Sequence, residues 1–73
     1  MEQTKFLEEL TDLMDTEEEL SMTTVLADIE EWDSLSRVAF LAFCTRSGVQ
    51  QVTPKQVNEA KTVQELYDMM EAH

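Results

Sequence analysis

The stretch Trp32-Asp33-Ser34-Leu35 divides the chain into two parts that differ in charge and in pattern. Twelve acidic residues and one lysine precede Ser34, so residues 1–33 carry a formal charge of −11, whereas the four acidic and four basic residues of 34–73 cancel. Asp33 is of a type strongly preferred as a helix N-cap, and apolar residues at helical spacing follow it. We therefore expect Ser34 at the start of a helix, where free backbone N–H groups and the helix dipole favour an attached or bound phosphate.

The composition predicts a single small all-α domain over residues 1–73. A chain of 73 residues is near the lower limit for folding without metals or disulfides. The single Cys44 cannot form an internal disulfide, and no Cys/His cluster offers a structural zinc site. Hydrophobic residues make up 42% of the chain, which is enough for a small core. One glycine and one proline argue against a β-sandwich or barrel, because these folds need many turn residues.

Charge and hydropathy limit the class of partner. No apolar run approaches transmembrane length, and residues 1–5 lack the features of a secretory signal, so we expect a cytoplasmic protein. A net charge of −11 opposes binding to nucleic acid and to anionic membranes. We expect a monomer whose partners have basic faces and whose associations weaken as salt rises. The acids of 28–33 do not have the spacing of an EF-hand, and no metal site is predicted.

Hydrophobic periodicity predicts a first helix over about residues 3–15, followed by a long loop. The predicted helix has one apolar stripe, formed by Phe6, Leu7, Leu10, Leu13 and Met14. Residues 16–33 sustain no such stripe, and we expect a loop pinned by Leu26 and Ile29, with a short turn of helix as an option. A loop of this length is unusual in a compact domain, which indicates a function for it or a contact that holds it.

A second helix is expected to begin after Asp33 and to run to about Ser47, with Gly48 as a left-handed C-terminal cap. Its predicted inward line consists of Leu35, Val38, Leu41 and Cys44 or Thr45, with Phe40 beside it and with Ala39, Ala42 and Phe43 partly outside it. So apolar a helix is either buried on two sides or presents a surface to a partner. On this stripe Cys44 is expected to be a small buried hydrophobe.

Two capping signals predict the last two helices. Thr53-Pro54-Lys55-Gln56 combines an N-cap, a proline at the first helical position and a glutamine three residues after the cap, which predicts a short helix over about 54–60. Thr62-Val63-Gln64-Glu65 is a second capping box. The apolar set of the helix that it opens is Val63, Leu66, Tyr67, Met69 and Met70. The expected fold is a small four-helix bundle with three longer helices, one short helix and a long loop between the first two.

The sequence gives no support for catalysis by Ser34. It contains no Gly-x-Ser-x-Gly elbow, and the only histidine, His73, is at a terminus that is expected to fray. We therefore expect that the chain is not itself an enzyme. The simplest alternative is that Asp33 only caps a helix and Ser34 is an exposed first-turn residue.

The chain resembles the acyl carrier protein family, including peptidyl and other thiolation carriers, over essentially its full length. The resemblance rests on Ile29-Glu30-Glu31-Trp32-Asp33-Ser34-Leu35-Ser36, on Gly48-Val49 and on Ala60-Lys61-Thr62-Val63-Gln64-Glu65-Leu66, together with size, acidity and helix order. It implies that Ser34 receives a 4′-phosphopantetheine from coenzyme A, whose terminal thiol carries an acyl or aminoacyl group as a thioester. The implied partners are a phosphopantetheinyl transferase, a loading ligase for the acyl or aminoacyl group, and a downstream transferase or synthase.

The resemblance also implies roles for neighbours of Ser34. Asp33 would be recognised by the phosphopantetheinyl transferase, and Leu35 would be an apolar anchor for that enzyme and for other partners. We expect Trp32 and Arg37 to take part in partner recognition as well. The Trp32-Asp33-Ser34 variant is similar to stand-alone carriers of aminoacyl or sugar-modifying pathways. The pathway and the cargo stay open, with Met14, Met69 and Met70 as candidates for an adaptable crevice or as plain core.

The second helix departs from the family pattern. Carriers of fatty acid synthesis usually have several glutamates there, whereas this chain has Ala39, Thr45 and Arg46, with Arg37 added near the start. Our hypothesis is a dedicated carrier of a specialised pathway, with a partner that packs on Phe43, Ala39 and Ala42 while acids of the long loop steer the encounter. The alternatives are an unmodified acidic docking module and a conformational switch through phosphorylation of Ser34.

Overall fold

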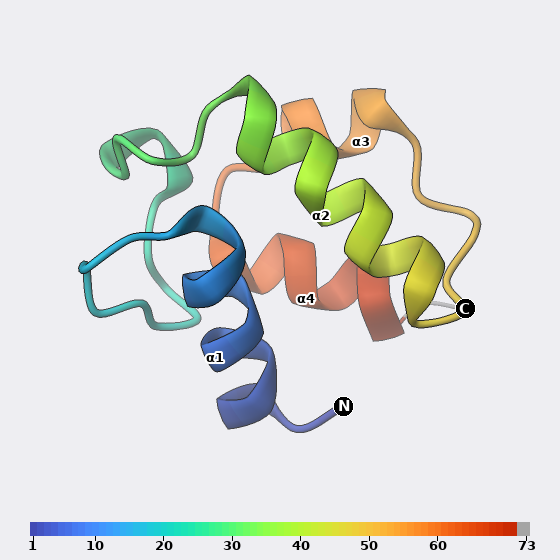
Figure 1. The fold of residues 1–73 in the computed structure, drawn as a ribbon, viewed down its shortest axis with the longest axis horizontal. Helices are drawn as coiled ribbons and strands as arrows, with labels where there is room; N and C mark the ends of the chain where they lie inside the picture. The colour runs from blue at the N-terminus through green and yellow to red at the C-terminus, as the bar shows by residue number, and fades with distance from the viewer. Residues whose placement is uncertain (72–73) are drawn as a thin grey trace.

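A computed structural model describes residues 1–71, and the prediction of a small all-α bundle is confirmed. The elements in chain order are α1 (Gln3–Met14), the 3₁₀ turn η1 (Leu26–Asp28), α2 (Ser34–Arg46), α3 (Pro54–Glu59) and α4 (Val63–Glu71) (Figure 1). The Cα radius of gyration is 10.9 Å. Within the described residues no helix is long and apolar enough to cross a membrane. The expected fraying of His73 lies outside the described residues.

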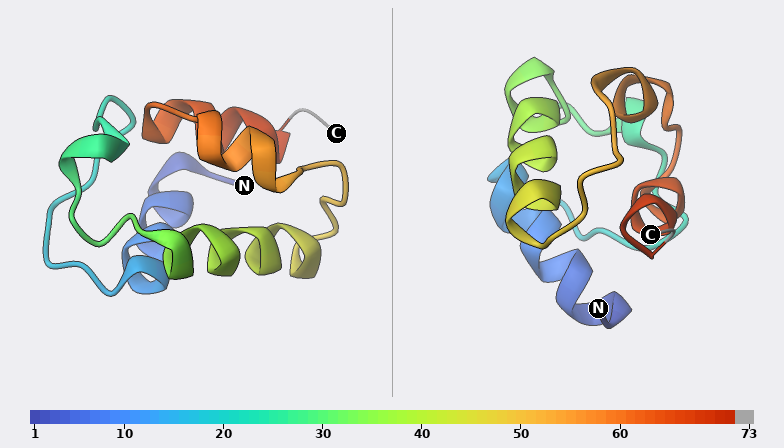
Figure 2. Two further views of the ribbon diagram at one scale, coloured as in Figure 1. Left: turned by 90° about the horizontal axis from the view of Figure 1, so that it is seen from above. Right: turned by 90° about the vertical axis from the view of Figure 1, so that its right-hand side faces the viewer.

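The core is assembled from every helix and from the turn η1. In Figure 2, left, α2 runs along one side of the molecule and α3 and α4 lie along the opposite side. The largest fully buried side chains are Phe6, Leu10, Leu26, Phe40, Cys44, Val57, Val63 and Leu66. Phe6 of α1 contacts Phe40 of α2 and Tyr67 of α4 edge to face, with ring centroids 6.3 Å and 5.2 Å apart. These ring contacts join three helices that are far apart in the sequence.

The predicted stripe of α1 is buried largely as expected. Phe6, Leu10 and Met14 are buried, and Leu7 and Leu13 pack against the core from its edge. The helix ends at Asp15, which has a left-handed backbone with φ of 52°. Aspartate is one of the few non-glycine types that adopts this conformation readily.

The long loop between α1 and α2 is held by backbone hydrogen bonds to the start of α4. The N–H of Leu26 donates to the carbonyl of Lys61 at 2.8 Å, and the N–H of Val63 donates to the carbonyl of Thr24 at 3.1 Å. Leu26 and Ile29 are buried, as predicted. The second half of the loop is therefore attached to the core. These hydrogen bonds satisfy backbone groups of a loop that is long and has little secondary structure of its own besides η1.

The inward face of α2 differs from the predicted one. Leu35 and Val38 are 81% and 65% exposed, and the predicted line through them is wrong. The buried face is formed by Ser36, Phe40, Phe43 and Cys44. Apolar side chains surround most of this helix, so more than one line at helical spacing was available. The buried face includes Ser36, and because serine is polar, the hydrophobic pattern did not identify this face.

The end of α2, the short helix α3 and the start of α4 lie at the predicted capping signals. Gly48 has φ of 86°, and the N–H of Val49 donates to the carbonyl of Cys44 at 2.8 Å, which closes α2. Both hydrogen bonds of the Thr53–Gln56 capping box are present, with Pro54 opening α3. The prediction of short helix α3 is confirmed, and α4 begins directly after Thr62.

Candidate functional site

The first turn of α2 is fixed by Asp33. The Oδ1 atom of Asp33 accepts a hydrogen bond from the backbone N–H of Ser36 at 3.0 Å, and its carbonyl accepts one from the N–H of Arg37 at 3.0 Å. The hydrogen bond from Ser36 holds the pKa of the Asp33 carboxyl below its ordinary value of 3.8. Ser34, the first residue of the helix, is exposed. Its hydroxyl therefore lies at the positive end of the α2 dipole.

The segment before the cap is locked by the carbonyl of Glu31. This oxygen accepts hydrogen bonds from the N–H of Asp33 at 3.0 Å and from the hydroxyl of Ser36. Ser36 is only 6% exposed, and this bond satisfies its buried hydroxyl. The ring of Trp32 packs edge to face on Phe40, with centroids 6.2 Å apart. Backbone bonds and an aromatic contact thus hold the residues on both sides of Ser34.

Arg37 lies over Ser34 from one helical turn further along α2. Its Nη2 atom donates to the Oγ atom of Ser34 at 3.3 Å, and its Nη1 atom donates to the carbonyl of Trp32 at 3.4 Å. Both residues line a hollow of about 200 Å³ between α2 and α3. Its other walls are Val38, Leu41, Pro54, Val57 and Asn58. The hydroxyl is therefore next to a small hollow with both apolar and polar walls.

The residues predicted to meet partners do not share one surface. Leu35 and Val38, which lie one turn apart, form the exposed apolar part of α2 beside Ser34. Phe43 is 7% exposed and belongs to the core, so the expectation that it lies partly outside the inward face is wrong. Ala39 and Phe43 line a hollow next to α1 together with Glu9 and other residues. The apolar surface that is open to a partner near Ser34 is Leu35 and Val38.

The sequence did not identify Val38 as a surface residue or the α3 residues as neighbours of Ser34. Val38 follows Ser34 by four residues, and residues at this spacing are neighbours on the surface of a helix. This spacing could have placed Val38 beside Ser34. Pro54, Val57 and Asn58 are about twenty residues away in the sequence, and only the packing of α3 against α2 brings them to the hydroxyl.

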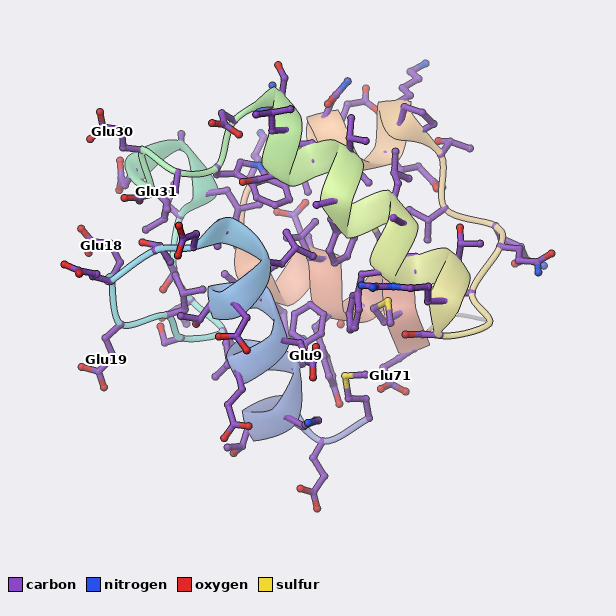
Figure 3. The ribbon with its side chains drawn as sticks, viewed as in Figure 1. Glu9, Glu18, Glu19, Glu30, Glu31 and Glu71 are labelled. Atoms are coloured by element: carbon purple, nitrogen blue, oxygen red, sulfur yellow. The ribbon has the colours of Figure 1, made fainter. Side chains whose placement is uncertain are left out.

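Acidic side chains gather at the end of the molecule formed by the long loop. In Figure 3 Glu18, Glu19 and Glu30 point outward from this end. Glu31 lies at the same end and accepts a hydrogen bond from the hydroxyl of Thr16 at 3.0 Å. Helix α2, in contrast, contains two arginines and no acid. The negative field is therefore displaced from the helix that carries the serine.

The site is chemically suited to accept a group. The exposed Ser34 hydroxyl is next to a guanidinium and a helix N-terminus, which both stabilise an attached anion. No histidine is present in residues 1–71 to activate it as a nucleophile. In the same part of the chain no group of three or more His, Cys, Asp or Glu side chains is arranged to bind a metal ion.

Comparisons with known proteins found no match, whether the chain was compared with protein-family models, with curated proteins or with solved structures.

Proposed function

We propose that the chain is a carrier protein that holds an acyl or aminoacyl group as a thioester on a 4′-phosphopantetheine arm attached to Ser34. The observation that carries this proposal is the exposed Ser34 hydroxyl at the start of α2, between the Asp33 cap and the Arg37 guanidinium. The resemblance of Ile29-Glu30-Glu31-Trp32-Asp33-Ser34-Leu35-Ser36 to the acyl carrier protein motif supports it. The all-α fold, with a long loop before the serine-bearing helix, agrees with that resemblance.

The residues around Ser34 fit the phosphate of such an arm. In the transfer, the Oγ atom of Ser34 forms a bond to the phosphorus nearer the pantetheine, and the pyrophosphate bond of coenzyme A breaks. The leaving group is adenosine 3′,5′-bisphosphate, and a base of the transferase takes the hydroxyl proton, since this site has no histidine. The positive end of α2 would then stabilise the negative diester. When the arm is attached, its terminal thiol supplies the thioester chemistry.

The surface near Ser34 fits transient docking of several enzymes. The proposed partners are a phosphopantetheinyl transferase, a loading ligase for the acyl or aminoacyl group, and a downstream transferase or synthase. Leu35 and Val38 offer them a small apolar contact, and the acids of the long loop steer partners with basic faces. The proposed setting is a specialised biosynthetic pathway in the cytoplasm, in which this chain is a monomeric substrate rather than an enzyme.

Intact-mass measurement after incubation with coenzyme A and a broad-specificity phosphopantetheinyl transferase tests the proposal. We expect a gain equal to one phosphopantetheinyl group. Ser34→Ala should abolish the gain, whereas Ser47→Ala, at an exposed serine beyond the other end of α2, should retain it. The proposed carrier function would be refuted if the wild-type chain gained no mass, or if the Ser34→Ala variant still gained it.

The second candidate is an unmodified acidic helical module that docks on a basic partner. The outward-pointing acids Glu18, Glu19 and Glu30 favour it, because such a surface attracts basic proteins without any attached group. A folded chain that gains no mass with the transferase, and that is isolated from its native host without modification, would support this candidate over the carrier.

A further inference from the structure

Both arginines of the chain lie on α2, at opposite ends of the helix. Arg37 is three residues after Ser34, so the two side chains share one face of the helix. Helical side chains lean toward the N-terminus, and the Arg37 guanidinium accordingly reaches back over the first turn. There it contacts the Ser34 Oγ atom through Nη2 and the Trp32 carbonyl through Nη1. Arg46 is in the last turn, about 14 Å from Arg37 along the helix axis.

Arg37 has no carboxylate partner within residues 1–71. The ion pairs in this part of the chain join the Met1 amino group to Glu71 and Lys5 to Glu9. The acid nearest to Arg37 in sequence, Asp33, directs its Oδ1 atom to the Ser36 N–H. Arg46, Lys55 and Lys61 are not in these ion pairs either, and among these basic residues Arg37 is the one that hydrogen-bonds to Ser34. Its hydrogen bonds to a carbonyl and a hydroxyl leave its positive charge uncompensated.

We propose that Arg37 is the intramolecular binding residue for a phosphodiester on Ser34. This inference rests on the proposed function. The phosphorus would be bonded directly to the oxygen that Arg37 Nη2 already contacts, so the charged oxygens would lie next to a donor of opposite charge. The Trp32 carbonyl holds the other end of the guanidinium, so the fork is positioned before the phosphate is attached.

Two consequences follow for the attached arm. Arg37 and Ser34 both line the hollow between α2 and α3, so the ion pair would hold the first atoms of the arm at this hollow. The diester charge would also be neutralised within α2, next to the exposed Leu35 and Val38. Partners would then meet an apolar surface next to a charge-balanced phosphate, although the whole chain has a formal charge of −11.

The two arginines allow a test with an internal control. Nuclear magnetic resonance of ¹⁵N-labelled protein resolves the Nε–H group of each arginine, and Arg37→Gln identifies which signal is which. After the transferase reaction, we expect the Arg37 signal to shift and its hydrogen exchange with water to slow by about two- to fivefold, the range for an exposed ion pair. The Arg46 signal should be unchanged. The Arg37 effect should shrink as salt is added.

A second readout is the change in melting temperature that modification causes. We expect modification to raise the melting temperature of the wild type and of Arg46→Gln more than that of Arg37→Gln, with Arg37→Lys in between because lysine keeps the charge but loses the fork. The inference is wrong, and the carrier function stands, if the mass gain occurs but the Arg37 signal and its hydrogen exchange are unchanged and modification raises the melting temperature of Arg37→Gln as much as that of the wild type. Absence of any mass gain would overturn both.

Discussion

Cys44 is a thiol that the core protects. It is 1% exposed, and its Sγ atom lies 3.3 Å from the Sδ atom of Met70. Burial raises the pKa of the Cys44 thiol to about 11, so the reactive thiolate is scarce near neutral pH. The expectation that Cys44 is a buried hydrophobe is confirmed.

This protection separates Cys44 from the thiol of an attached arm. At about pH 8, where ordinary thiols begin to ionise, we expect a chromogenic aromatic disulfide to label no thiol rapidly in the native unmodified protein. One fast thiol should be present after the transferase reaction, and Cys44 should react only when denaturant is added. Fast labelling of the native unmodified chain would show that Cys44 is open to solvent, and Cys44→Ala would identify the source.

Asp33 makes the first turn of α2 sensitive to acid. Because the folded state lowers the pKa of its carboxyl from 3.8, its ionised form stabilises the fold. This contribution is complete above the unfolded value and is lost as pH falls through the lower folded value. Asparagine at this position can still cap the helix but does not titrate.

The test of this cap compares wild type with Asp33→Asn in denaturant unfolding between about pH 6 and about pH 3. The stability of wild type relative to the variant should decrease over this range. Taking the difference removes the effect of the other acids, which titrate in both proteins. A difference that stays constant with pH would contradict the lowered pKa.

At the scale of elements, the orientation of α2 has a direct consequence for stability. Leu26 of η1 is 1% exposed, whereas Leu35 of α2 is 81% exposed. Leu26→Ala should therefore lower the free energy of unfolding by about 2–5 kcal/mol. The same change at Leu35 should alter it by no more than about 0.5 kcal/mol. Urea unfolding of both variants checks this pair, and a large loss for Leu35→Ala would mean that the predicted inward line was the correct one.

Local signals in the sequence were sufficient for the helix boundaries but not for the face of α2. The caps at Asp33, Thr53 and Thr62 depend on residues within one turn, and a sequence contains that information directly. The buried face of α2 depends on Ser36, whose hydroxyl is satisfied by the carbonyl of Glu31. That bond exists only when the loop has its folded path, so no periodicity could have indicated it.

Some features of the candidate site can likewise be predicted from the local sequence, whereas others depend on tertiary packing. The position of Ser34 at a helix start and its cap by Asp33 follow from the sequence, and the structure agrees with both. The contact of Arg37 with the Trp32 carbonyl depends on the bend of the chain before α2. The hollow beside Ser34 depends on the packing of α3 against α2, which joins residues that no local pattern connects.

At the scale of the whole molecule, charge is separated along the chain. Residues 1–33 carry a formal charge of −11 and residues 34–73 carry none. Within residues 1–71 few of these acids are in ion pairs, and Glu18, Glu19 and Glu30 point into solvent at one end. Their mutual repulsion lowers the stability of the folded state, because unfolding moves the charges apart.

Salt should therefore stabilise the unmodified protein. Raising sodium chloride from about 0.02 M to about 0.5 M shortens the screening length severalfold, so we expect the melting temperature to rise. Glu18→Gln should raise the low-salt melting temperature and reduce this response, since it removes one repelling charge. Glu59→Gln, the same change at an exposed residue of the neutral half, should do neither. If the melting temperature is insensitive to salt, or if both variants behave alike, the charge separation does not control the stability of the fold.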